Sequence, residues 1–108
     1  MRFKDFEIEV ITMLIGDQLE PEILKPVLKS DSVDVYFSGA GYFATASDEA
    51  LPTARSVFSS PIIIGRSNEL EVGFVVFVQD RELTLECYDY VGDFPDGFRD
   101  QDVSIRAT

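Results

Sequence analysis

The chain has 108 residues, 45% of them hydrophobic, with one cysteine and no histidine or tryptophan. This length and composition suit one folded domain, expected to span residues 1–108, with a core that needs no disulfide or metal. Twenty acidic and nine basic residues give a net charge of −11, which opposes binding to nucleic acid and to anionic membranes and attracts basic partners.

The first thirty residues favour helices. We predict a first helix with Asp5 and Thr12 on its polar side and a buried side that carries Phe3, Phe6, Val10, Met13 and Leu14. The segment Phe6–Val10 also alternates as a strand would, but the length of the apolar run favours a helix. A second helical pattern covers Leu19–Leu28, where Pro26 predicts a break or a kink.

From Ser32 onward the pattern is typical of strands. Aromatic and β-branched segments at Val33–Phe37 and Tyr42–Ala46, separated by Ser-Gly-Ala-Gly, predict a hairpin. Four further strands are expected, with turns between them, at Ser56–Ile64, Leu70–Val78, Leu83–Tyr90 and Val103–Arg106. Helices followed by strands predict an α+β fold, in which one N-terminal helix and an interrupted second one pack on a mainly antiparallel sheet of about five to six strands.

Two strands also indicate which faces are covered. Phe74–Val78 has no polar residue, which predicts a central strand covered on both sides. Along the next strand, Leu83, Leu85 and Cys87 share one face and polar residues share the other, so we expect the first face to lie on the core.

The composition offers little for catalysis. Without histidine, neither a Ser-His-Asp triad nor a Cys-His pair can form, and Cys87 is expected to be an inert core thiol. The composition leaves a Ser–Lys dyad open. Glu82 and Glu86 lie two positions apart on one strand face and could flank a bond for acid–base hydrolysis. We predict no catalytic residue and keep a small carboxylate-based hydrolase as the least favoured alternative.

No cofactor or metal site is predicted. The segment Gly39–Ala44 matches the dinucleotide pattern G-x-G-x-x-A, but strand-like residues follow where that mechanism requires a helix, so these are interpreted as hairpin glycines. The acids Asp89, Asp93, Asp96, Asp100 and Asp102 resemble a calcium loop in composition only. Lysines and arginines are dispersed, which gives no track for nucleic acid.

Compartment signals are sparse. One cysteine excludes an internal disulfide and suits a reducing compartment. The segment MRFKDFEIE carries charges of both signs where a secretion signal needs an apolar core, and no stretch approaches the roughly 20 apolar residues that span a bilayer. We therefore expect a cytoplasmic protein with no membrane partner.

Acids and aromatics are concentrated in Glu86–Asp102, with six acids and one base, Arg99. Aromatic side chains can anchor an interface, and carboxylates around them steer a basic partner. The predicted partner-binding residues are Glu86, Tyr88, Asp89, Tyr90, Asp93, Phe94, Asp96, Phe98, Asp100 and Asp102. The alternative is that the aromatics face inward and fasten a solvated loop to the sheet.

These observations favour a small, acidic, non-enzymatic domain that binds a basic protein. Inhibitors that neutralise a basic nuclease, such as immunity proteins and antitoxins, have this charge and size, which is an analogy and not a motif match. The alternative from another class is a homo-oligomeric structural or accessory domain, such as a homodimer, that associates through a strand edge or a Phe-rich surface.

Overall fold

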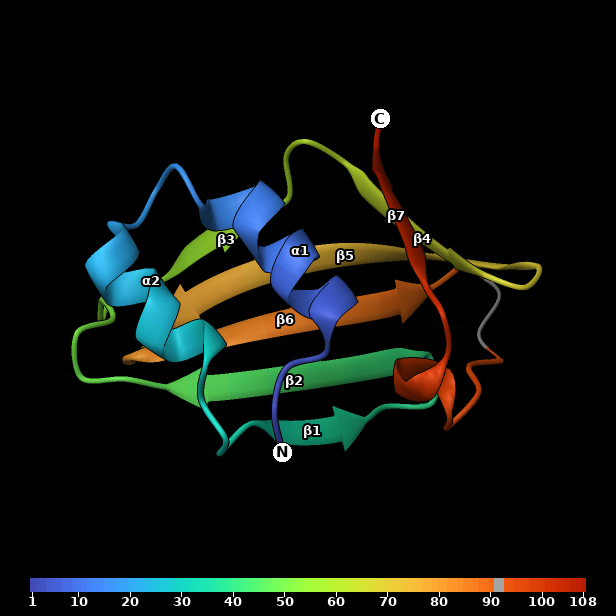
Figure 1. Cartoon of the computed structure of the whole chain (residues 1–108), viewed down its shortest axis with the longest axis horizontal. Coiled ribbons are helices and arrows are strands. Elements are labelled where there is room, and N and C mark those ends of the chain that lie inside the picture. The colour runs from blue at the N-terminus through green and yellow to red at the C-terminus, as the bar shows by residue number, and fades with distance from the viewer. Residues whose placement is uncertain (91–92) are drawn as a thin grey trace.

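The computed structural model describes residues 1–90 and 93–108 and shows helices packed on an antiparallel sheet (Figure 1). The helices are α1 (Asp5–Ile15) and α2 (Pro21–Leu28), and a short 3-10 helix, η1, covers Phe98–Asp100. The strands are β1 (Asp34–Phe37), β2 (Gly41–Ser47), β3 (Ser56–Phe58), β4 (Ile63–Ser67), β5 (Leu70–Gln79), β6 (Glu82–Asp89) and β7 (Ser104–Ala107). The α+β prediction is confirmed, with seven strands among the described residues instead of five to six.

The strand order is β1-β2-β6-β5-β4-β7, and β3 pairs alongside β5. Every pair is antiparallel. The ten-residue β5 carries both β3 and β4, because β4 pairs with its first half and β3 with its second. The expected strand Ser56–Ile64 is therefore two strands, separated around Pro61, which has no N–H to donate to a sheet. The hairpin from Val33 to Ala46 is confirmed as β1 and β2.

Helix α1 confirms the predicted burial of Phe6, Val10 and Leu14 but not that of Met13. Its buried residues are Phe6, Glu7, Val10, Ile11, Leu14 and Ile15, whereas Met13 is 37% exposed. Phe3 is buried as predicted, although it lies in the extended segment before the helix. Residues 7, 11 and 14 are related by helical spacing, so the same geometry that buries Ile11 also buries the Glu7 carboxylate.

Helix α2 runs without a break across Pro26, contrary to the expected interruption. Pro26 removes the hydrogen bond to the carbonyl of Glu22 four residues earlier. Both residues are exposed, so water can bind that carbonyl. The opposite side of the helix buries Leu24 and Val27, and this packing holds the helix together.

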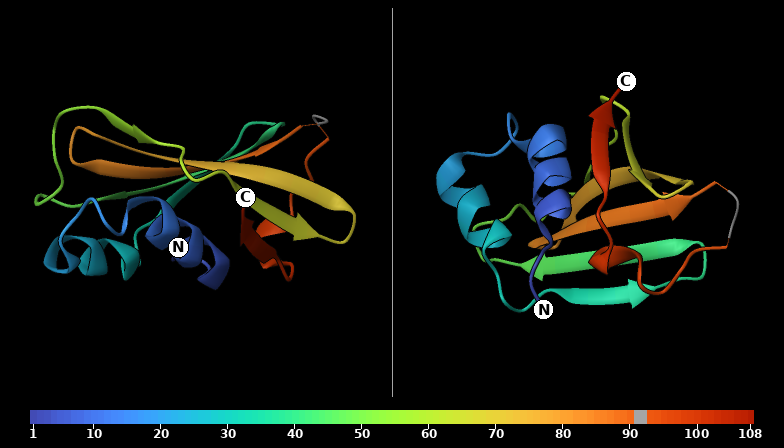
Figure 2. Two further views of the ribbon diagram at one scale, coloured as in Figure 1. Left: turned by 90° about the horizontal axis from the view of Figure 1, so that it is seen from above. Right: turned by 45° about the vertical axis from the view of Figure 1, so that its right-hand side comes forward.

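The two faces of the sheet differ in what covers them. Toward the helices, alternate residues of the central strands form the core, including the predicted face of Leu83, Leu85 and Cys87. Both helices and η1 lie on that side (Figure 2). On the other side, which we call the open face, no described segment covers the sheet. Val75 and Phe77 are therefore only half-buried there, and β5 is central but not covered on both sides as predicted.

Candidate functional site

The open face carries aromatic side chains around a few carboxylates. Strand alternation and register place on it Tyr36 of β1, Phe43 of β2, Val75 and Phe77 of β5, and Glu82, Glu86 and Tyr88 of β6. The ring of Tyr36 lies 6.4 Å from that of Phe43, which lies 6.5 Å from that of Phe77. Tyr36 is 67% exposed. Phe43 and Phe77 are half-buried. Aromatic side chains that remain partly exposed on an uncovered face are typical of binding sites.

Charge is distributed unevenly across the open face. Strands β1, β2 and β6 contain no lysine or arginine, and they place Asp34, Glu82 and Glu86 on this face. At the other end of the sheet, Glu71 lies 3.6 Å from Arg66 and 3.5 Å from Arg106. The half of the open face over β1, β2 and β6 is therefore acidic, whereas the half over β4 and β7 carries its own counter-charges.

Glu86 occupies the centre of the acidic half. Its cross-strand neighbours are Phe43 on β2 and Val75 on β5, and its side chain is half-buried. Directly opposite residues of an antiparallel pair have Cβ atoms about 4.5–5.5 Å apart, so the carboxylate stands beside apolar side chains. Among residues 1–90 and 93–108, no side chain makes a hydrogen bond or ion pair with Glu86.

One arginine of the chain already lies on this face. The guanidinium carbon of Arg55 is 5.5 Å from the centre of the Phe77 ring, and Nη1 donates a hydrogen bond of 2.8 Å to Oε1 of Gln79. Stacking on an aromatic ring combined with a planar hydrogen bond is the arrangement that suits a guanidinium group. The open face can therefore seat an arginine side chain.

The acidic segment predicted as one surface is divided between the two sides of the sheet. Glu86 and Tyr88 lie on the open face, and the ring of Tyr90, which is 65% exposed, contacts Tyr88 edge-on at 5.6 Å. Burial raises the pKa of the Tyr88 hydroxyl. Asp89 points to the other side and is buried. Val91 and Gly92, within the same segment, lie outside the described residues.

Beyond that point the segment fastens the chain to the core. Phe98 is fully buried and half-buried Phe94 packs on it at 5.0 Å, so Phe98 is corrected from a partner contact to a core residue, as the inward-facing alternative expected. The remaining predicted residues are exposed: Asp93, Asp96, Asp100 and Asp102. Asp100 accepts a hydrogen bond of 2.8 Å from Lys4, which lowers its pKa.

Three residues of the open face were missed from the sequence: Tyr36, Phe43 and Phe77. The signal was the register of the predicted hairpin, which places Tyr36 opposite Phe43. Which face of that hairpin the helices would leave open was not readable from local pattern.

A buried polar cluster joins the two ends of the chain. Arg99 donates two hydrogen bonds of 2.8 Å to the Glu7 carboxylate, and the Tyr42 hydroxyl donates another of 2.6 Å. Glu7 is 0% exposed and Arg99 6%. The bonds to Glu7 raise the pKa of Arg99. All three groups are satisfied inside the core, so this cluster is a structural clip and not a reactive site.

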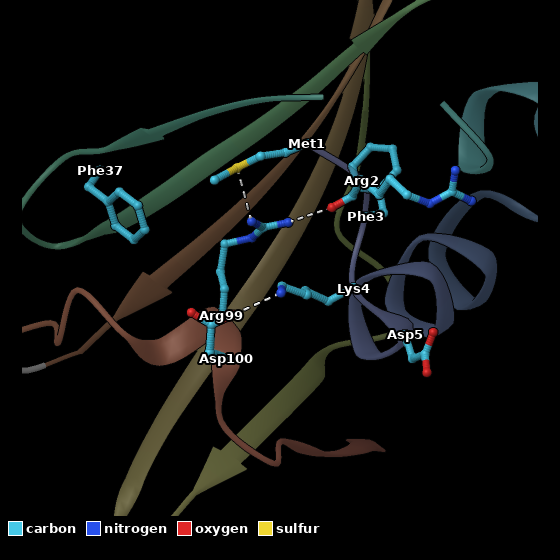
Figure 3. Close-up of a pocket in the computed structure, with 8 residues that line it drawn as sticks. All are labelled: Met1, Arg2, Phe3, Lys4, Asp5, Phe37, Arg99 and Asp100. Atoms are coloured by element: carbon cyan, nitrogen blue, oxygen red, sulfur yellow. Dashed lines mark hydrogen bonds and ion pairs between the residues drawn. The ribbon is translucent and has the colours of Figure 1, made fainter. Parts of the chain in front are cut away.

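A cavity of about 490 Å³ lies next to this clip, at the N-terminus (Figure 3). Arg99 closes one wall, where it donates to the Met1 sulfur at 3.5 Å and to the Arg2 carbonyl at 2.9 Å. Lys4 reaches Asp100 across the cavity, and the Arg2 side chain points away from both. Lys4 and Arg99 are engaged in holding the N-terminal segment, which argues against a ligand site.

Because Cys87 and Tyr42 are buried, we expect the folded protein to lose stability in alkaline solution. Burial raises the pKa of the Cys87 thiol above its ordinary 9.0 and that of Tyr42 above 10.0. Below about pH 9 both groups are protonated in the folded and in the unfolded chain, so their contribution to the free energy of unfolding is complete. Above this pH the unfolded chain releases protons that the folded chain retains. The free energy of unfolding should fall by up to about 1.4 kcal/mol per pH unit for each group. Urea denaturation of wild type and Cys87→Ala between pH 8 and 11 should show a shallower initial decline in the variant; equal slopes would contradict the prediction.

The described residues give no support to a carboxylate-based hydrolase or to a metal site made of carboxylates. Glu82 lines two cavities, of about 220 and 260 Å³, and Glu86 lines neither. No three His, Cys, Asp or Glu side chains in the described parts of the chain are grouped so that they could hold a metal ion. Across those same residues, no helix has the length and apolar content to cross a membrane.

Comparison with protein-family models, with curated proteins and with solved structures finds no match to this chain.

Proposed function

We propose that the protein is a non-enzymatic binding domain whose open face docks a positively charged protein. The observation that carries this proposal is the uncovered sheet face, on which Tyr36, Phe43 and Phe77 surround carboxylates that have no counter-charge on the same strands. Aromatic side chains supply contact area in a protein interface, while carboxylates raise the association rate with a basic partner. An inhibitor that neutralises a basic protein in the cytoplasm is a role that this surface would suit.

Charge supports a basic partner over a second copy on this face. Two copies would bring together surfaces of chains that each carry −11. Like charges facing each other across an interface oppose association, and strands β1, β2 and β6 contain no lysine or arginine to offset them. A basic protein gains from the same charges.

A second candidate, self-association through β1, has its own observation. β1 is an edge strand of four residues with an exposed Tyr36, and an uncovered edge can pair with the same edge of another copy. Sedimentation of the purified protein separates the two: a monomer at all concentrations supports the first proposal, and a stable dimer supports the second.

The proposal can be tested by a pull-down, in which the immobilised protein is used as bait to retain a basic protein from the native cell lysate. We compare wild type with two variants that each lose three negative charges. One, Asp34→Asn/Glu82→Gln/Glu86→Gln, neutralises the open face; the matched control, Glu9→Gln/Asp17→Asn/Glu20→Gln, neutralises exposed acids of the helical side. Wild type and control should retain the same basic protein at low salt and release it at high salt, which screens surface charge. The captured protein is identified by mass spectrometry and its binding is repeated with purified components.

The open-face variant should retain much less of that protein. Equal retention by all three baits would place the interface elsewhere. Retention of no basic protein by wild type would overturn the proposed function.

A further inference from the structure

We infer that the open face has one specific anchor point, where the partner's arginine side chain lies over Phe43 and pairs with the Glu86 carboxylate. This inference rests on the proposed function and adds the chemistry of the partner group. It combines two features: a carboxylate held among apolar side chains, and an arginine of the chain itself that is already seated on the same face.

The position of Glu86 gives a docked cation two kinds of contact. Phe43 lies directly across from it on β2, with the Tyr36 ring 6.4 Å further out, and Val75 closes the other side on β5. A cation that reaches the carboxylate therefore also lies against an aromatic ring. Charge-assisted hydrogen bonds are stronger than neutral ones, and partial exclusion of water by the neighbouring side chains strengthens them further.

Arg55 shows how a guanidinium fits on this surface. It stacks on Phe77 and bonds to Gln79, two residues along the same strand face. Glu86 lies opposite Val75, on the other side of Phe77 along β5, so Arg55 and the anchor point lie over neighbouring rings of this face, Phe77 and Phe43, whose centres are 6.5 Å apart. At the anchor point the acceptor is a carboxylate instead of an amide, and no described cation of the chain pairs with it.

Arginine fits this site better than lysine. Its planar group can donate two parallel hydrogen bonds to a carboxylate while its face lies on a ring, whereas an ammonium group is a compact point charge with a stronger hold on water. The Phe43 ring belongs to β2 and the Glu86 carboxylate to β6. Seven register pairs join these two strands, so the ring and the carboxylate are held at a fixed spacing.

Glu82 provides a matched control on the same strand and the same face. It is exposed, its cross-strand neighbour on β2 is Ser47 instead of an aromatic residue, and the Ser47 hydroxyl lies 3.5 Å from it. Glu82→Gln and Glu86→Gln thus remove the same charge from neighbouring positions. Only Glu86→Gln removes the carboxylate that lies directly across from Phe43.

The test is an NMR titration of isotope-labelled protein with Nα-acetyl-arginine-N-methylamide, which carries the guanidinium and no net charge besides it. Saturable shifts are expected at the amides of Phe43 and Glu86. The lysine analogue should bind more weakly, and the neutral citrulline analogue should cause no saturable shift. Glu86→Gln should weaken arginine binding about tenfold or more, and Phe43→Leu about threefold, while Glu82→Gln stays within about twofold.

Three results would overturn the anchor: no saturable shift in wild type, equal binding of the citrulline analogue, or equal losses in Glu82→Gln and Glu86→Gln. The failure of the anchor is distinct from that of the proposed function. If a basic protein binds the wild type but Glu86→Gln and Glu82→Gln bind it alike, only the anchor is wrong. If wild type retains no basic protein, the proposed function fails whatever the titration shows.

Discussion

Replacing Glu7 by alanine is expected to lower the free energy of unfolding by about 3–5 kcal/mol, the usual cost of removing one partner from a buried ion pair. Glu7 accepts hydrogen bonds from Arg99, from the Tyr42 hydroxyl and from the Lys4 backbone N–H. Its loss leaves a guanidinium and a hydroxyl in the core without their acceptor. Because single domains are stable by about 5–15 kcal/mol, the variant should lose a large share of its stability.

Urea denaturation checks this result, with Glu9→Ala as the control. Glu9 lies on the same helix but is exposed, so its loss should change stability by no more than about 0.5 kcal/mol. In a double-mutant cycle, Glu7→Ala with Arg99→Ala should cost less than the sum of the single losses, because the two side chains act on each other. A Glu7→Ala variant as stable as Glu9→Ala would show that the clip contributes nothing.

Gly41→Ala is expected to be the most damaging of the small substitutions, with a loss of roughly 3 kcal/mol or more. An added Cβ at this position would stand 1.9 Å from the Cys87 carbonyl oxygen, which belongs to the backbone of the neighbouring strand. The chains of β2 and β6 would have to separate at the Gly41–Tyr88 pair. Glycine is needed here because another backbone comes so close, and not for its freedom of φ.

Gly97→Ala is the matched control, since nothing lies within 4 Å of an added Cβ at that position. Thermal or urea unfolding should show a small change for Gly97→Ala and a large one for Gly41→Ala. Similar stabilities of the two variants would contradict the close approach of β2 and β6.

The fold was readable from the sequence where local pattern determines it. The alternation of Leu83, Leu85 and Cys87 placed the correct face of β6 on the core, and the hairpin glycines marked the β1–β2 connection. The pairing of β2 with β6 was not readable, because the paired residues lie about 35–47 positions apart along the chain and no turn joins them. The split of β3 from β4 depended on the length of β5, which offers room for two partners.

The candidate site was only half predicted, for two physical reasons. The aromatic residues of the acidic segment cannot be told apart by local pattern, yet Tyr90 is exposed and contacts Tyr88, whereas Phe98 lies in η1 and is buried in the core. The burial of Glu7 had no local signal either, because its partner Arg99 is 92 residues away. Exposure of the open face depends on both helices packing on the same side, which is a property of the whole fold.

The most direct test of the open face as the docking surface is the association rate of the purified basic partner at low and high ionic strength. Asp34→Asn/Glu82→Gln/Glu86→Gln should slow association at low salt by about tenfold or more and flatten its salt dependence, because steering charges next to an interface control the rate. The control Glu9→Gln/Asp17→Asn/Glu20→Gln has the same net charge and should change the rate much less. Equal slowing by both variants would mean that overall charge alone attracts the partner, and a greater effect of the control would place the interface on the helical side.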